Sequence, residues 1–145
     1  MMGKLGFDIV VSKLEPKDLQ FCQQAVKTYD SISNIVWHGD LYRLADPREN
    51  EFASVMYVNE GQDSAVMFNY LTRSRYGNGT LSPIKMKGLN ADKKYTIREI
   101  NLFPGTTSRL PANATYSGDY LMAIGFNPGV NANRASVILE IKEGK

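Results

Sequence analysis

The sequence predicts a mainly β protein: an antiparallel β-sandwich of about seven to eight strands, preceded by one strand and one helix. From about Asp40 onward, apolar and polar residues alternate in short runs separated by Gly, Asn, Asp and Pro, a pattern typical of strands and turns. Residues 15–36 instead repeat apolar residues at spacings of three and four, which predicts a helix. The 43% hydrophobic and 22% charged residues indicate a folded domain and exclude disorder of the whole chain.

The first 38 residues differ in pattern from the rest. Residues 5–11 are mostly apolar and end in β-branched residues, which predicts a strand buried on both faces. In the helix that follows, Pro16 suits the first turn and Asp18 suits the positive end of the helix dipole. One strand followed by one helix has no neighbouring strand with which to pair. We therefore interpret residues 1–38 as the end of an α/β domain and residues 39–145 as a separate β domain.

Seven runs rich in Val, Ile, Tyr and Phe predict the strands of the β domain, a number that favours a sandwich. These runs are residues 40–44, 52–58, 64–71, 81–87, 94–101, 119–125 and 135–142. Residues 59–63 predict a hairpin loop between the second and third runs, and residues 88–92 predict another before Tyr95. Pro83 cannot donate a hydrogen bond, so we expect the fourth strand at a sheet edge or with a bulge.

Composition excludes several classes of protein. The 17 basic and 15 acidic residues give a net charge of +2 without a basic cluster, which argues against a nucleic-acid partner. No stretch approaches the roughly 20 apolar residues of a membrane span. The first residues lack the apolar core of a signal peptide, and the compartment stays open between cytoplasm and periplasm. The single cysteine, Cys22, excludes an internal disulfide. A chain of 145 residues is too short for a complete (β/α)₈ barrel, which needs about 250.

Several short motifs follow one another along nearly the whole chain. They are Leu5-Gly6-Phe7-Asp8, Gly39-Asp40-Leu41-Tyr42-Arg43-Leu44, Asp46-Pro47, Ala53-Ser54-Val55-Met56-Tyr57-Val58, Ser64-Ala65-Val66-Met67-Phe68, Lys87-Gly88-Leu89-Asn90 with Lys94-Tyr95, and Tyr116-Ser117-Gly118-Asp119-Tyr120-Leu121-Met122 followed by Gly125. In this order they resemble the C-terminal part of the glycoside hydrolase family 36 α-galactosidases. Residues 101–114 are longer than the family pattern, and the residues after Gly125 match weakly, which leaves the subfamily and its sugar open.

The resemblance implies a parent enzyme with an N-terminal β-supersandwich, a catalytic (β/α)₈ barrel and a C-terminal antiparallel β-sandwich. Residues 1–38 would then be the last strand and helix of the barrel, a remnant of that domain, and residues 39–145 the C-terminal β-sandwich domain. The family hydrolyses terminal α-galactosides with retention, which requires a carboxylate nucleophile and a carboxylic acid/base about 5 to 5.5 Å apart. Both family aspartates would precede Met1. We therefore expect the chain itself to be inactive, with no catalytic, cofactor-binding or metal-binding residue and no cofactor.

The resemblance also implies partners. They are the catalytic barrel of the parent chain, which the domain would buttress, an α-galactoside substrate for the parent, and further copies in a homo-oligomer. If this holds, Leu19, Val26 and Tyr29 of the helix should face the barrel in the parent and be partly exposed here, which predicts self-association. Two alternatives from other classes stay open: a free-standing carbohydrate-binding sandwich, and an immunoglobulin-like adhesion domain, which the helical start makes awkward.

Three single residues invite a functional interpretation. Asp8, near a predicted barrel-strand end, is interpreted as a carboxylate satisfying backbone donors, with a role in lining a sugar site as the alternative. His38, the only histidine, is interpreted as a polar hinge residue rather than as part of a triad or metal site. Cys22 fits an apolar helix face as a packed thiol rather than a nucleophile.

The aromatic residues are a candidate platform for stacking sugars, although we expect most of them in the core or on sheet faces. They are Trp37, Tyr42, Tyr57, Tyr70, Tyr76, Tyr95, Tyr116 and Tyr120. Two tripeptides, Asn78-Gly79-Thr80 and Asn113-Ala114-Thr115, match the glycosylation acceptor pattern and are interpreted as turn residues.

Overall fold

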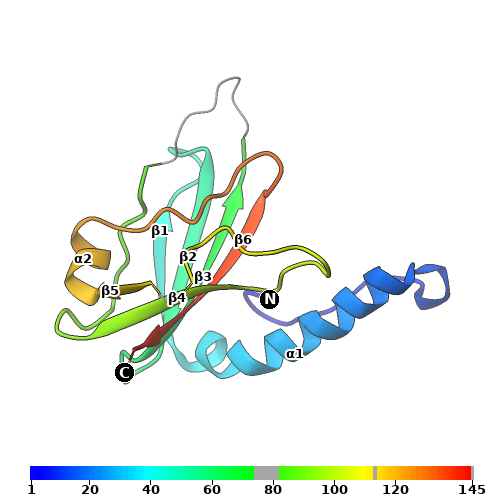
Figure 1. Cartoon of the computed structure of the whole chain (residues 1–145), viewed down its shortest axis with the longest axis horizontal. Helices are drawn as coiled ribbons and strands as arrows, with labels where there is room; N and C mark the ends of the chain where they lie inside the picture. The colour runs from blue at the N-terminus through cyan, green and yellow to red at the C-terminus, as the bar shows by residue number, and fades with distance from the viewer. Residues whose placement is uncertain (74–81, 113, 145) are drawn as a thin grey trace.

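The computed structural model describes residues 1–73, 82–112 and 114–144, and its main feature is one antiparallel sheet with a long helix beside it (Figure 1). Within these residues the sheet has six strands in the order β1-β2-β3-β6-β4-β5. The strands are β1 (Asp40–Ala45), β2 (Phe52–Val58), β3 (Ser64–Leu71), β4 (Lys94–Ile100), β5 (Thr115–Ser117) and β6 (Ser136–Glu143). The prediction of a mainly β, antiparallel protein is confirmed.

The hairpin of β2 and β3 matches its prediction in both strands and loop. The two strands pair from Phe52 opposite Leu71 to Val58 opposite Ala65. In the loop, the side-chain carbonyl of Asn59 accepts hydrogen bonds from the backbone N–H groups of Asp63 (3.1 Å) and Ser64 (3.0 Å). The Asn59 side chain thus closes the loop by bonding to backbone N–H groups on its far side, a common role of asparagine in turns.

The last strand, β6, lies in the middle of the sheet. It pairs on one side with β3, where Phe68 stands opposite Ile138, and on the other with β4, where Ile97 stands opposite Ile141. Its residues 137–141 are all buried. A central strand that is covered on both faces reads as a continuous apolar run, and β6 has this character apart from Glu140.

The two faces of the sheet carry separate hydrophobic cores. The larger core lies under the segments 84–89 and 121–130, and includes Met56, Met67, Met86, Tyr95, Leu121 and Leu139. The smaller core lies under the long helix α1 (Pro16–His38), where Ile32 and Val36 pack on Val66, Phe68 and Ile138. The predicted helix over residues 15–36 is therefore confirmed.

The described residues contain one sheet of six strands, so the prediction of a sandwich with seven to eight strands is not confirmed. Of residues 119–125, predicted as a strand, residues 119–123 instead belong to the helix α2 (Gly118–Ala123). Within the predicted strand 81–87, residues 82–87 form only one isolated bridge, between Ile84 and Phe126. The predicted loop at residues 88–92 therefore joins no pair of strands. Irregular segments and α2 cover the face where a second sheet was expected.

The strand predicted at residues 5–11 is also wrong for this structure. The segment is extended, pairs with no strand among the described residues, and ends in the 3₁₀ turn η1 (Val11–Lys13). Its apolar side chains predicted burial, but a strand forms only where a neighbouring backbone supplies its hydrogen-bond partners. The segment is instead linked to the sheet near its start, where the Tyr57 hydroxyl donates to the Met2 carbonyl (2.9 Å).

Candidate functional site

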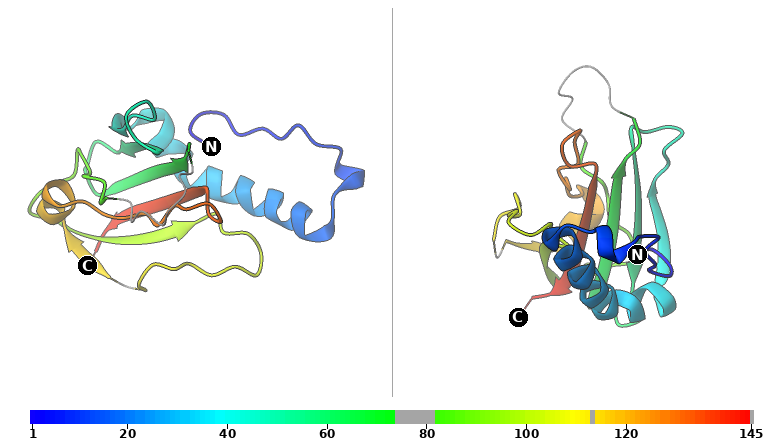
Figure 2. Two further views of the ribbon diagram at one scale, coloured as in Figure 1. Left: turned by 90° about the horizontal axis from the view of Figure 1, so that it is seen from above. Right: turned by 90° about the vertical axis from the view of Figure 1, so that its right-hand side faces the viewer.

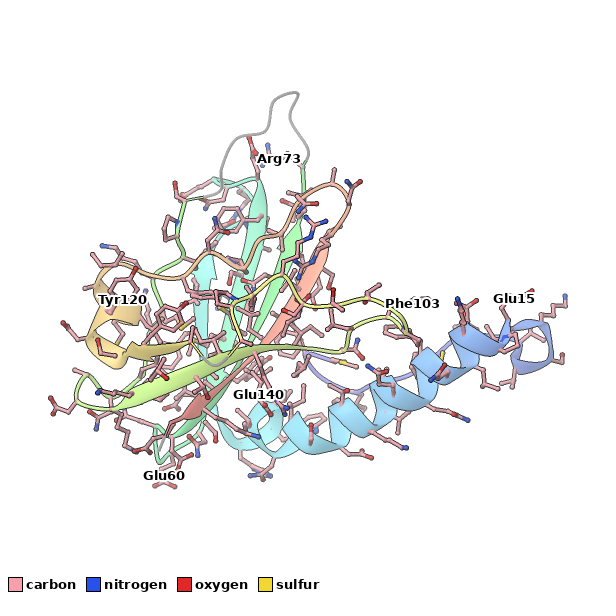
Figure 3. All side chains as sticks on the ribbon, viewed as in Figure 1. Glu15, Glu60, Arg73, Phe103, Tyr120 and Glu140 are labelled. Carbon is pink, nitrogen blue, oxygen red and sulfur yellow. The ribbon has the colours of Figure 1, made fainter. Side chains whose placement is uncertain are left out.

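The long helix α1 has two halves with different surroundings. Of its buried residues, Ile32 and Val36 lie in its second half and pack on the sheet, whereas Ala25 lies just before its midpoint. The first half extends beyond the sheet, where Phe21 contacts Phe103 of the loop after β4 at a ring distance of 5.4 Å (Figures 1 and 3). Gln24 donates from its side chain to the Leu102 carbonyl (2.9 Å) in the same region. The first half of α1 therefore contacts the loop after β4, while its apolar residues Leu19 and Val26 stay exposed.

Large apolar side chains are exposed on this part of the molecule. Val10 and Val11 are 58% and 61% exposed, and Leu19 and Val26 of α1 are 37% and 44% exposed. The segment that precedes α1 runs back along the helix toward the sheet (Figure 2). We call the exposed apolar residues of these two neighbouring elements the N-terminal apolar surface. Its members are Phe7, Ile9, Val10, Val11, Leu19 and Val26.

The helix residues expected to face a partner fit this surface. Leu19 and Val26 are exposed and Tyr29 is half-buried. The Tyr29 hydroxyl accepts a hydrogen bond from the indole N–H of Trp37 (3.0 Å). Exposed apolar residues on adjacent elements are characteristic of surfaces that bind another protein surface.

The other three single-residue candidates lie apart from one another. Asp8 is exposed and has no hydrogen-bond or ion-pair partner among the described residues, so it satisfies no backbone donor there. His38 is the last residue of α1 and lines a small polar hollow with Asp40 and Glu60. Cys22 is half-buried on α1, with a free thiol. The structure brings none of them together into a catalytic arrangement.

The aromatic residues divide as expected into many packed and few exposed. Tyr95 is fully buried, and its hydroxyl donates to the Gln62 carbonyl (2.6 Å). Tyr42, Tyr57 and Tyr70 are half-buried, and Tyr76 lies outside the described residues, as do residues 78–80 and Asn113 of the two glycosylation patterns. Of the candidate platform residues that the structure describes, Trp37 and Tyr120 are exposed, and they lie on different helices, α1 and α2.

Tyr120 belongs to a pocket of about 530 Å³ at the α2 end of the sheet. Its ring stacks on Tyr116 at 6.0 Å and an interplanar angle of 21°, and Tyr116 meets Phe126 edge-on at 5.5 Å. The polar wall of the pocket includes Arg109 and Arg134. We call this site the aromatic pocket.

The motif around α2 explains the shape of this pocket. The Ser117 side chain accepts a hydrogen bond from the Tyr120 backbone N–H (3.2 Å) and so caps α2 at its first turn. A Cβ atom at Gly118 would stand 1.9 Å from the Asn90 carbonyl oxygen, and one at Gly125 would stand 2.6 Å from the backbone of Ile84. Both glycines are therefore needed for close packing of the helix against the chain beneath it.

A second hollow of about 530 Å³ lies between α1 and the loop after β4, and it shares Arg109 and Arg134 with the aromatic pocket. Arg134 forms an ion pair with Glu99, whose side chain is 4% exposed. Asn101 also lines this hollow, with φ +60 and a buried side-chain oxygen that has no hydrogen-bond partner among the described residues. These polar residues were not predicted from the sequence, because no local motif marks residues that meet from distant loops.

A charged cluster lies on the α1 face of the sheet. Glu140 is 3% exposed and accepts from Arg98, with the Lys142 ammonium 2.9 Å from its other oxygen. Burial alone would raise the pKa of Glu140, but the hydrogen bonds from Arg98 and Lys142 outweigh that effect and lower it. This carboxylate is held ionised by its partners and is poorly suited to act as a general acid.

The described part of the chain offers neither a metal site nor a membrane span. No group of three or more His, Cys, Asp or Glu residues is placed there to hold a metal ion. None of the helices in that part is long and apolar enough to cross a membrane. The candidate sites are thus an apolar surface, an aromatic pocket and an adjoining polar hollow.

These features define a mainly β domain with one long helix, whose second half packs on the sheet and whose first half exposes apolar residues. The family model described as the glycosyl hydrolase family 36 C-terminal domain matches residues 52–141, and the chain belongs to this family. Among curated proteins, it is 29% identical to alpha-galactosidase 1 of Pediococcus pentosaceus over 86% of this chain. It is 28% identical to alpha-galactosidase AgaA of Geobacillus stearothermophilus over 72% of this chain. The resemblance stated from the sequence is confirmed.

Solved structures share the fold. An alpha-galactosidase from Lactobacillus brevis superposes with a TM-score of 0.80 at 20% identity over 99% of this chain and 19% of that one. The family 36 alpha-galactosidase AgaB of Geobacillus stearothermophilus gives a TM-score of 0.76 at 24% identity, over 92% of this chain and 17% of that one. The chain spans only 15% and 14% of the two curated relatives named above. It corresponds to the C-terminal domain of such enzymes.

Proposed function

We propose that this chain is the non-catalytic C-terminal part of a family 36 α-galactosidase and that it stabilises the enzyme by packing against its catalytic barrel. The parent would hydrolyse terminal α-galactosides with retention. The observation that carries the proposal is the N-terminal apolar surface, because the chain matches a C-terminal domain and covers only 15% of the length of a relative, which leaves a large further region of such an enzyme to contact it. That region would supply the cover that the surface lacks in this chain.

The extended segment 5–11 supports a division of the chain near residue 38. It has the sequence of a buried strand but no strand partner among the described residues. In the parent, the neighbouring barrel strands would supply the missing hydrogen bonds, and α1 would cover the outside of the barrel. Residues 1–38 then form the last strand and helix of the barrel, and residues 39–145 form the C-terminal domain.

The helix α1 would serve both domains at once. Its Ile32 and Val36 pack on the sheet, whereas Leu19 and Val26 are exposed for another contact. A helix shared in this way fixes the orientation of two domains, because it cannot move relative to one without disturbing the other. Contacts between copies of the parent through the same region are a further part of the proposal.

A chimera tests this function. The matching 124 residues of the Pediococcus pentosaceus enzyme would be replaced by this chain, and hydrolysis of a chromogenic α-galactoside and thermal unfolding would be measured. We expect an active, folded chimera, and we expect Val26→Asp to lower its unfolding temperature by several degrees because a charge would be buried at the new contact. Asn34→Asp, an exposed polar position on the same helix, serves as the matched control.

Two results would contradict the proposal. One is hydrolysis of the chromogenic substrate by the isolated 145-residue chain above the uncatalysed rate, because it would place a catalytic site here. The other is a chimera whose unfolding temperature is changed by neither Val26→Asp nor Asn34→Asp, because the N-terminal apolar surface would then be exposed to solvent in the chimera as well.

A further inference from the structure

The aromatic pocket presents the apolar surface of one exposed ring, Tyr120, which its neighbours hold in position. Phe126 is 9% exposed at its base, Tyr116 is half-buried against it, and Tyr120 is 44% exposed at the rim. The stacking and edge-on contacts of the three rings limit their rotation. The cap from Ser117 to the Tyr120 backbone fixes the helix that carries the outermost ring.

Hydrogen-bonding groups stand beside this surface. Arg109 is exposed, lines the pocket, and has no hydrogen-bond or ion-pair partner among the described residues. Arg134 lines it from the other loop and uses one guanidinium nitrogen, Nη2, for Glu99. Because a guanidinium carries five N–H donors, both residues retain donors for a ligand. The Asn131 side chain, also in the wall, is turned toward its own loop by a bond to the Gly129 carbonyl (3.2 Å).

This combination restricts the chemistry of a ligand. Small-molecule pockets typically measure about 300–1,000 Å³ and combine an apolar surface with a few polar groups, and this one has about 530 Å³. The ligand needs one flat apolar face for Tyr120 and several oxygen acceptors around its edge for the two arginines. A pyranose ring has both: axial C–H groups on one face and hydroxyl groups around the rim.

We propose that the aromatic pocket binds a pyranose unit of an oligosaccharide, with the ring stacked on Tyr120 and its hydroxyl oxygens accepting hydrogen bonds from Arg109 and Arg134. Among the described residues that line the site there is no carboxylate pair for glycoside hydrolysis, so it holds sugar without cleaving it. The adjoining hollow shares both arginines and gives room for further units of the same oligosaccharide.

The pocket is independent of the surface used in the proposed function. It lies at the α2 end of the sheet, whereas the N-terminal apolar surface lies on α1 and the segment before it (Figure 3). Sugar binding by the 145-residue chain and barrel docking by the chimera are therefore separate measurements. Either one can fail while the other succeeds.

The test is a titration of the ¹⁵N-labelled 145-residue chain with raffinose, followed by amide chemical shifts. We expect saturable shifts at millimolar sugar that are centred on residues 116–126 and on the loops of Arg109 and Arg134. Tyr120→Ala should weaken binding about tenfold, whereas Tyr120→Phe, which keeps the ring, should bind within about twofold of the original chain. Trp37→Ala removes another exposed aromatic residue, on α1, and should leave binding unchanged.

A second variant guards against loss of structure at α2. Arg109→Gln changes an exposed side chain that forms no hydrogen bond or ion pair with any residue the structure describes, so the variant should fold normally. Its affinity for raffinose should fall several-fold, because hydrogen-bond donors to the sugar are lost. The absence of saturable shifts with raffinose would overturn the proposal. So would equal weakening by Tyr120→Ala and Trp37→Ala, or shifts at this pocket with inorganic phosphate but none with raffinose.

Discussion

Glu99 and Arg134 form an ion pair between the end of β4 and the loop before β6, 35 residues apart in the sequence. The Glu99 side chain is 4% exposed and the Arg134 side chain 18% exposed. Glu99 also accepts from the Ser108 hydroxyl (2.9 Å). One carboxylate thus connects three separate parts of the chain at the junction of the two pockets.

Removal of one member of this pair should destabilise the fold. Arg134→Ala leaves the Glu99 carboxylate buried without its counter-ion, and we expect a loss of about 3 kcal/mol in the free energy of unfolding. Urea unfolding followed by circular dichroism measures it. Arg48→Ala breaks the ion pair of Arg48 with Asp46, in which the arginine side chain is 88% exposed, and should leave the midpoint unchanged. Equal effects of the two substitutions would contradict the prediction.

Acid should weaken the fold partly through Glu140. Its pKa in the folded chain is lowered from the ordinary 4.5, because the hydrogen bonds from Arg98 and Lys142 outweigh the opposing effect of burial. The unfolded chain takes up this proton at the ordinary pKa. The stabilisation is therefore present above pH 4.5 and is lost as the pH falls through the folded pKa.

The substitution Glu140→Gln should remove this dependence. Between pH 7 and about pH 3, the free energy of unfolding of the original chain should fall by more than that of the variant, as measured by urea titration at each pH. Glu60→Gln, on the exposed hairpin loop, provides the matched control and should follow the original chain. Parallel pH profiles for the original chain and Glu140→Gln would count against the prediction.

Two glycines with positive φ allow the cost of backbone strain to be measured separately from the cost of steric crowding. Gly125 has φ +98 and lies against the backbone of Ile84, whereas Gly105 has φ +87 and open space within 4 Å of the position that a Cβ atom would occupy. Alanine at Gly105 should cost about 1 kcal/mol for the backbone conformation, and alanine at Gly125 should cost about 3 kcal/mol. Thermal unfolding measures both costs. A similar loss of stability at the two sites would contradict the prediction, because it would mean that the backbone near Ile84 moves to make room for the new Cβ atom.

The uncovered part of α1 should drive self-association of the 145-residue chain. Leu19 and Val26 are exposed, so contact between copies would remove apolar area from water. Sedimentation velocity over a concentration series should show oligomers that Val26→Asp reduces and Asn34→Asp does not. A monomer at all concentrations would argue that this surface is too small to associate without the barrel.

The sequence predicted those elements whose signals are local. The strands around the 59–63 loop are short apolar runs separated by five turn-forming and polar residues, so the two strands and the loop between them could be predicted directly. Helix α1 was predicted because its apolar residues recur at spacings of three and four, although only Ile32 and Val36 among those that carried the prediction are buried. Helix α2 was mistaken for a strand because Tyr120, Leu121 and Met122 form a short apolar run, although Ser117 before it and Gly125 after it are the signals of a helix cap and a helix end.

Other features depended on partners that are distant in the sequence. Residues 5–11 are apolar, but no local pattern states whether a neighbouring strand exists. The pockets were missed because Arg109 and Arg134 meet only through the fold. The aromatic candidates could be named, whereas the selection of Tyr120 among them required knowledge of which rings are exposed.

Because α1 is one continuous helix of 23 residues, about 35 Å long, its two halves should differ in local stability. Backbone amides near Ile32 and Val36 can exchange with deuterium only when the sheet contact opens. Those near Leu19 are protected by little more than the helix itself and should exchange far faster. The helix should therefore fray from its free end, and a protease should cut there first. Docking of a partner on that end would suppress the fraying and make the helix rigid along its whole length.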